Sequence, residues 1–517
     1  MIERILTVGG LTLLSRVTGF VRDIVLAYVL GAGPLADVFF VAWRLPNHFR
    51  AIFAEGAFNA AFVPAYARIR EQQGGDSVRR FANRIFTLMV ASQLVLLVLG
   101  LMFMPWVVDA LAPGFSGERF ALAVELSRIT FPYLMLITLV TLYSGILNAR
   151  ERFAAAAAAP ILLNLTMIAT LACAWLFPSA SHAAAWGVLI AGCLELMLVT
   201  GDAGVVGASV RFRVPRWDEN IKRFFKALGP AVVGSSGVQL ALLADTIIAS
   251  LLAQGALSAL YYADRLNQLP IGVIGIAAGT VVLPEMARRI AAGDETGALD
   301  AQNRAIELTL LLSVPCVAAF LIVPDLIMRA LFARGAFTVA DAAAAGATLA
   351  AYTVGLIPFV LIRSVTATFL ARGDTWTPVK AVLIAAVVNI AFKVALMGPL
   401  AQVGLALATA IGAWINFGLV VWFAARAGLF SVDDRLKLST AKIAVAGVVL
   451  ALTLWLAQDP VLSLYRTWGL LRDVAALATL AAIGAIVYGC LVAALFGRQW
   501  LAAFGRSRGR KVTATED

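Results

Sequence analysis

Charged side chains lie within segments of the sequence that are otherwise long and apolar. In the first half these are Arg16, Arg22, Asp23, Asp37, Arg44 and Arg50, and in the second half they are Asp245, Asp264, Arg265, Arg363 and Lys393. On insertion scales, a charge at the centre of a membrane helix costs about 2.5–3.5 kcal/mol, so several are tolerable only where they face a wet cavity or one another. The sequence therefore predicts a polar path through a membrane.

Arginine is the most frequent of these residues, and its chemistry favours an anionic ligand. The guanidinium stays protonated when it is dehydrated, and its planar fork matches the oxygens of phosphate, whereas lysine readily loses its proton when buried. A cavity lined with several arginines and fewer carboxylates is suited to an anion. Phosphate or pyrophosphate is the first candidate.

A structural alternative is that each arginine only neutralises a nearby aspartate. These pairs cannot account for every arginine, because the arginines exceed the aspartates within reach. The candidate pairs are Arg16 with Asp23, Arg44 with Asp37, and Arg265 with Asp264.

Helical spacing places the first charges together. Arg16 and Asp23 are seven residues apart, as are Ser15 and Arg22, so the two pairs form adjacent stripes on one helix. Gly19 lies near these four polar groups, where it could bend the helix or let a ligand approach the backbone closely. In the next segment, Pro46 could break the helix before Arg50.

The composition identifies the elements that must position these side chains. The 517 residues are 61% hydrophobic and 14% charged, with a mean hydropathy of +0.90. Soluble domains carry about 25% charged residues, so a soluble enzyme is excluded. A bilayer span needs roughly 20 apolar residues, which allows about 14 transmembrane helices in an all-α integral membrane protein. The apolar segments are 6–31, 36–65, 82–107, 120–148, 157–177, 184–207, 225–253, 258–287, 305–332, 343–371, 377–398, 402–425, 439–457 and 470–496.

Basic residues concentrate in the even-numbered loops, which are the loops that follow the second, fourth and later even-numbered apolar segments. Examples are 68–84 and 211–226, and the C-terminal tail at 498–511 is basic as well. Cytoplasmic loops are enriched in Lys and Arg, so both termini are expected in the cytoplasm. This rule also explains the net charge of +11 without a nucleic-acid partner. The N-terminus does not read as a cleavable signal peptide, because charges interrupt its apolar run.

Familiar catalytic and metal-binding motifs are missing from the sequence. It contains no G-x-x-x-x-G-K-[ST] phosphate loop, and its four cysteines and two histidines are isolated from one another. We therefore expect a transporter without nucleotide hydrolysis, cofactor or metal. Membrane potential or an ion remains a possible source of energy.

An internal repeat divides the chain. YYADRL at 261–266 resembles FFVAWRL at 39–45, and VLPEMAR at 282–288 resembles FVPAYAR at 62–68, both at offsets close to 220 residues. The shift spans six expected helices, so two pseudo-symmetric six-helix lobes would share one orientation, as in transporters with parallel repeats. The predicted domains are 1–210 for the N-terminal lobe, 211–430 for the C-terminal lobe, and 431–517 for two additional helices and a basic cytoplasmic tail.

Particular stretches resemble a known family. They are SRVTGFVRD at 15–23, the run from Gly31 to Asp37, LPN at 45–47, FAEGAF at 53–58, APGF at 112–115, FPY at 131–133 and YYADRL at 261–266. In these stretches, and in order along essentially the whole chain, the sequence resembles the MurJ (MviN) family of bacterial lipid II flippases, within the multidrug, oligosaccharidyl-lipid and polysaccharide exporter superfamily.

The resemblance implies a substrate and a set of site residues. The family moves lipid II, an undecaprenyl-pyrophosphate-linked disaccharide-pentapeptide, from the inner to the outer leaflet for peptidoglycan synthesis. Gln268 stands where relatives often have a carboxylate, which puts an essential acid there in doubt. The residues that match functional positions are Arg16, Arg22, Arg50 and Arg265, with the polar neighbours Ser15, Asp23, Asp37 and Asp264, and Arg363 in place of a lysine.

Our expectation is a monomeric lipid II flippase of the bacterial inner membrane that works by alternating access. Arg16, Arg22, Arg50 and Arg265 would form one anion site for the pyrophosphate, supplied by both lobes, while Asp23 and Asp264 hold arginines in place. Two alternatives stay open: a cation-coupled multidrug or lipid-linked oligosaccharide exporter of the same superfamily, and a membrane scaffold for cell-wall enzymes.

Overall fold

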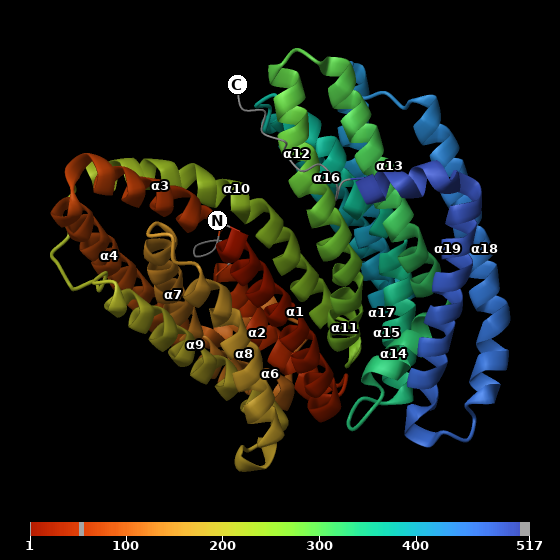
Figure 1. The fold of residues 1–517 in the computed structure, drawn as a ribbon. Coiled ribbons are helices and arrows are strands. Elements are labelled where there is room, and N and C mark those ends of the chain that lie inside the picture. The colour runs from red at the N-terminus through yellow and green to blue at the C-terminus, as the bar shows by residue number, and fades with distance from the viewer. Residues whose placement is uncertain (1, 51–55, 507–517) are drawn as a thin grey trace. The chain divides into compact units, whose positions relative to one another are not determined.

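A computed structural model of the protein describes residues 2–50 and 56–506, which fold into helices without a strand (Figure 1). The predicted all-α class is confirmed. The helices are α1 (Ile2–Leu30), α2 (Pro34–Arg50), α3 (Gly56–Gln73), α4 (Gly75–Met102), α5 (Met104–Leu111), α6 (Gly117–Thr130), α7 (Tyr133–Asn148), α8 (Ala154–Ala172), α9 (Ala180–Val205), α10 (Glu219–Ser250), α11 (Ala256–Pro270), α12 (Ile276–Ala291), α13 (Glu295–Ile322), α14 (Pro324–Phe332), α15 (Val339–Thr353), α16 (Leu356–Leu370), α17 (Trp376–Arg426), α18 (Asp434–Leu464) and α19 (Arg472–Arg506).

Many of these helices can cross a membrane. Among the described residues, nine helical segments are long and apolar enough to do so. One of them, α17, has 51 residues and a backbone break at Ala401, two residues after Pro399, so it covers two of the expected apolar segments. The chain is therefore a multi-pass membrane protein, and the count of about 14 spans stays a prediction.

The order of helices repeats along the chain. Helices α4 and α13 begin at Gly75 and Glu295, which are 220 residues apart, and each has 28 residues. Helices α5 and α14 begin at Met104 and Pro324, again 220 residues apart. The parallel repeat inferred from the sequence is thus visible in the element order.

The chain forms two compact units. The first unit contains Met1–Ala259 and Phe332–Asp341, and the second contains Leu260–Leu331 and Ala342–Asp517. In the first unit, α8 packs against both α1 and α9; in the second, α18 packs against α13 and α19. The predicted domain boundaries at residues 210 and 430 stay predictions.

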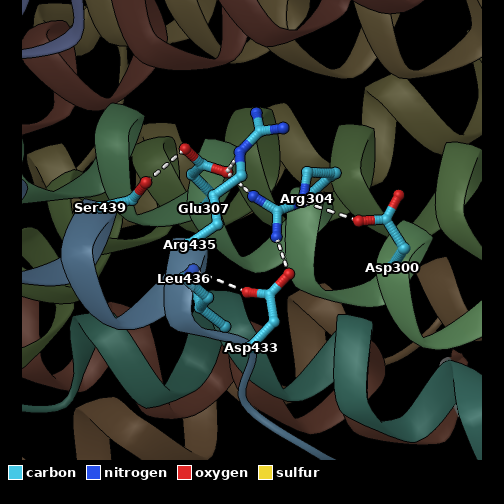
Figure 2. A network of polar contacts seen from close by, with 7 residues as sticks. All are labelled: Asp300, Arg304, Glu307, Asp433, Arg435, Leu436 and Ser439. Carbon is cyan, nitrogen blue, oxygen red and sulfur yellow. Dashed lines mark hydrogen bonds and ion pairs between the residues drawn. The ribbon is translucent and has the colours of Figure 1, made fainter.

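A polar network attaches α18 to α13 in the second unit (Figure 2). Glu307 is 2% exposed and accepts a hydrogen bond of 2.6 Å from Ser439. Arg304 forms ion pairs with Glu307 and Asp433, and with Asp300 at 3.2 Å. Asp433 caps α18 by accepting from the Leu436 backbone N–H. Burial opposes the ionisation of Asp433, but the Leu436 N–H and the Arg304 guanidinium together hold the pKa of this carboxyl below its usual value.

Replacing Glu307 with alanine should loosen this attachment. Ser439 would lose its acceptor, while Arg304 would keep Asp300 and Asp433. We expect a loss of about 1.5–3 kcal/mol, the range for a hydrogen bond to a charged group. Thermal unfolding of the purified protein measures this as a lower Tm. Glu307→Gln should retain more stability because it can still accept from Ser439, and the matched control Asp300→Ala should change little. Equal Tm values for Glu307→Ala, Glu307→Gln and Asp300→Ala would contradict the role of Glu307 in attaching α18 to α13.

Candidate functional site

Arg22 on α1 is a buried and fixed cation. The residue is 6% exposed, and its Nε and Nη2 donate to Oδ1 of the neighbouring Asp23 at 3.2 and 2.7 Å. Its Nη1 donates to Asn164 Oδ1 at 3.0 Å, and its guanidinium carbon lies 4.7 Å from the centre of the Trp43 ring. These contacts hold the charge in one orientation and offset its desolvation.

Asn164 joins α8 to α1, as polar amides in membrane helices often do. Its amide nitrogen donates to the Ser15 carbonyl at 3.0 Å and to the Thr18 hydroxyl at 3.1 Å. A Cβ on Gly19 would lie 3.3 Å from that nitrogen, so the glycine permits this close approach. α1 continues through Gly19 as one helix, and a bend at Gly19 stays a prediction.

Arg16 differs from Arg22 in having no partner. Its side chain is exposed and makes no hydrogen bond or ion pair with the described residues. The expected pair of Arg16 with Asp23 is wrong, because the Asp23 carboxylate is turned to Arg22. Ser15 beside it is half-buried and contributes its carbonyl to Asn164. Arg16 is thus an accessible cation in an apolar helix.

Asp37 near the start of α2 is completely buried, and donors surround it. It accepts from Arg119 at 2.7 Å, from the Gly255 N–H at 2.8 Å, and from the N–H and hydroxyl of Ser258 at 2.9 and 2.5 Å. The expected pair of Asp37 with Arg44 is wrong. Asp37 instead acts as the anion at the first turn of α11, where free N–H groups favour negative charge.

The remaining polar residues of α2 extend toward its end. Arg44 donates to Thr246 at 3.2 Å, and Arg50 donates to Asn47 at 3.2 Å, with further contacts. Pro46 lies inside α2, so the expected helix break before Arg50 is wrong. Residues 53–55 of the family-like stretch at 53–58 lie outside the described part of the chain.

In the second unit, Arg265 and Asp264 lie on α11. The guanidinium carbon of Arg265 is 4.8 Å from the centre of the Tyr261 ring. The amide of Gln268 donates to the Asp264 carboxylate. The pairing of Asp264 with Arg265 stays a prediction, and neither residue is without partners.

The side chain of Arg363 on α16 packs against two glycines, Gly275 and Gly279. The sequence analysis did not predict this contact. A Cβ on Gly275 would be 3.6 Å from Arg363 Cδ, and one on Gly279 would be 3.5 Å from Arg363 Cβ. Gly275 ends a π-helical turn, η3 (Ile271–Gly275), of the kind often found at functional sites. Arg363 is exposed and makes no hydrogen bond or ion pair with the described residues. The G-x-x-x-G spacing of Gly275 and Gly279 is the feature of the sequence that indicates close packing here.

Each unit therefore presents an accessible arginine without a partner, Arg16 in the first and Arg363 in the second. Each also holds an arginine against an aromatic ring, Arg22 on Trp43 and Arg265 on Tyr261. Accessible guanidinium groups can bind phosphate oxygens in a bidentate manner. The assignment of these residues to substrate binding stays a prediction.

Comparison with known proteins identifies the family of the chain. A family model described as "Lipid II flippase MurJ" matches residues 26–475. A "Probable lipid II flippase MurJ" from Rhizobium meliloti (strain 1021) is 40% identical over 470 residues, covering 89% of this chain and 87% of that protein.

Two solved structures share the fold. One is a lipid II flippase MurJ in an inward closed conformation, with a TM-score of 0.81 and 23% identity over 95% of this chain and 98% of that one. The other is an inward-facing multidrug resistance MATE family transporter of the MOP superfamily, with a TM-score of 0.66 and 17% identity over 80% and 95% of the two chains. Since the family model covers most of the sequence and a curated relative matches at high coverage, the chain belongs to the MurJ family of lipid II flippases.

Proposed function

We propose that the protein carries lipid II, the undecaprenyl-pyrophosphate-linked peptidoglycan precursor, from the inner to the outer leaflet of the bacterial cytoplasmic membrane. The observation that carries the proposal is Arg16, an exposed guanidinium that makes no hydrogen bond or ion pair with the described residues and lies in a long, mostly apolar helix. A charge in this position is costly unless a ligand or water offsets it. The pyrophosphate of lipid II is an anion of suitable chemistry, and the family relatives are named for this substrate.

The proposed mechanism is alternating access. Arg16 and Arg363 would contact the pyrophosphate directly, while Arg22, Arg50 and Arg265 contribute positive charge from more constrained positions. Asp23 would keep Arg22 oriented, since it binds the same guanidinium at two nitrogens. The prenyl chain would stay in lipid beside α18 and α19. No nucleotide would be hydrolysed, so membrane potential or an ion gradient would reset the carrier.

We place the protein in the inner membrane as a monomer with both termini in the cytoplasm. The excess of Lys and Arg in the even-numbered loops supports this orientation. A cation-coupled exporter would share the fold, but its substrates favour an acidic cavity. A scaffold for cell-wall enzymes would leave the charges within the apolar helices unexplained.

Depletion of the protein in its native bacterium tests the proposal. We expect lipid II to accumulate in the inner leaflet and to decline several-fold in the outer leaflet, as measured by an impermeant probe of each leaflet. Expression of the intact chain from a plasmid should restore the distribution. An unchanged lipid II distribution, with altered drug resistance, would instead support an exporter.

A further inference from the structure

A polar cavity lies in the first unit, and none of the arginines discussed above lines it. It has a volume of about 410 Å³ and lies where α3, the start of α4, the α7–α8 loop and the α9–α10 loop meet. The side chains that matter for its chemistry are Tyr66, Asp76, Arg79, Asn83 and Arg150. The α3–α4, α7–α8 and α9–α10 connections that border the cavity all belong to the basic even-numbered loops.

The cavity contains hydrogen-bond donors that no described group satisfies. Asn83 is only 6% exposed, and its Oδ1 accepts from the Arg211 N–H at 2.9 Å, whereas its amide nitrogen has no partner and is not sealed from open space. Tyr66 is 2% exposed; its hydroxyl accepts from Arg150 Nε at 3.2 Å and donates to none of the described residues. Both donors are therefore available to a ligand in the cavity that accepts hydrogen bonds.

Two arginines add positive charge to these donors. Arg150 is oriented by its bonds to Tyr66 and to the Val206 carbonyl at 2.7 Å, and its second terminal nitrogen has no described partner. Arg79 lines the cavity with no hydrogen bond or ion pair to the described residues. Asp76 is the one acidic side chain of the lining, so the cavity keeps a net positive charge. The N–H groups at the start of α4, which begins at Gly75, reinforce this preference.

We propose that this cavity binds the phosphate group of a small phosphate ester. The donors of Tyr66, Asn83, Arg79 and Arg150 would bind its oxygens, and the forks of the two arginines suit their geometry. The cavity is too small for a lipid-linked disaccharide-pentapeptide, so it is a site separate from that of the transported substrate. The ester has two possible sources, the headgroup of an anionic phospholipid or a soluble phosphate compound. The proposal does not depend on the direction or substrate of transport.

The test uses the full-length protein in nanodiscs. Binding of inorganic phosphate and glycerol 3-phosphate is measured by calorimetry in phosphatidylcholine nanodiscs, and retention of phosphatidylglycerol is measured by native mass spectrometry in mixed nanodiscs. Arg79→Ala removes one free guanidinium, and Asn83→Asp keeps the acceptor for Arg211 while it removes the free donor. The matched control is Arg80→Ala, because Arg80 is the next residue, is exposed and bonds to Ser77 at 2.8 Å without lining the cavity.

We expect Arg79→Ala and Asn83→Asp each to weaken binding by about tenfold, as for the loss of one charge-assisted hydrogen bond, and Arg80→Ala to leave it unchanged. Thermal unfolding must show that each variant is folded. Binding of inorganic phosphate or glycerol 3-phosphate identifies a soluble ligand, and retention of phosphatidylglycerol alone identifies a lipid. Equal losses of binding affinity for Arg79→Ala and Arg80→Ala would overturn the proposal and would indicate an effect of general surface charge. The proposal would also be overturned if the unmodified protein bound neither the soluble phosphates nor phosphatidylglycerol.

Discussion

Replacing Arg16 with alanine should abolish growth support in a depleted strain while leaving the amount of protein in the membrane unchanged. Arg16 makes no hydrogen bond or ion pair with the described residues, so its removal breaks no contact of the folded chain. A charge-assisted hydrogen bond is worth about 1.5–3 kcal/mol, so binding of a pyrophosphate should weaken by tenfold or more. Complementation and quantitative immunoblotting of the same cultures measure the two effects separately.

Arg22 provides the matched comparison on the same helix. Its guanidinium binds Asp23 and Asn164 and lies over Trp43, so Arg22→Ala removes the ion pair between Arg22 and the buried Asp23 carboxylate. This variant should lower the amount of folded protein, because loss of one partner of a buried pair is strongly destabilising. Arg16→Lys keeps the charge without the fork and should retain partial function. Normal growth with Arg16→Ala at native expression would contradict a direct role for Arg16.

The sequence was informative about charge and repetition. Long apolar segments, interrupted by Arg22 and Asp23, predicted a membrane protein with a polar path, because the cost of a charge in lipid depends on little besides its depth. The offset of about 220 residues predicted a repeat that the starts of α4 and α13 reproduce.

The partners of the charged residues were much less predictable. Spacing along a helix fixes the face on which a side chain lies, but it does not identify what packs against that face. Asp37 therefore seemed to pair with Arg44 on its own helix, whereas its partners Arg119 and Ser258 are 82 and 221 residues away in sequence. The contact of Arg363 with Gly275 and Gly279 likewise depends on how α16 packs, which no local pattern encodes.

Asp37→Ala should be among the most destabilising single substitutions in the first unit. It removes a completely buried carboxylate and leaves four donors without this acceptor: the Arg119 guanidinium, the Gly255 N–H, and the N–H and hydroxyl of Ser258. Breaking a buried ion pair by removing one partner costs about 3–5 kcal/mol. We expect a large drop in Tm of the purified protein and less protein in the membrane, with a loss of activity no greater than the loss of protein.

Arg119→Ala separates the ion pair from the rest of this arrangement. Asp37 would keep its bonds from Gly255 and Ser258, so the loss of stability should be clearly smaller than for Asp37→Ala. Because the two residues are in contact, the effects of the double variant should be less than additive. A double variant with additive effects would show that the pair is not coupled. A Tm unchanged by Asp37→Ala would show that the carboxylate does not hold α2 to the start of α11, and Asp37 would then be free to act on a ligand instead.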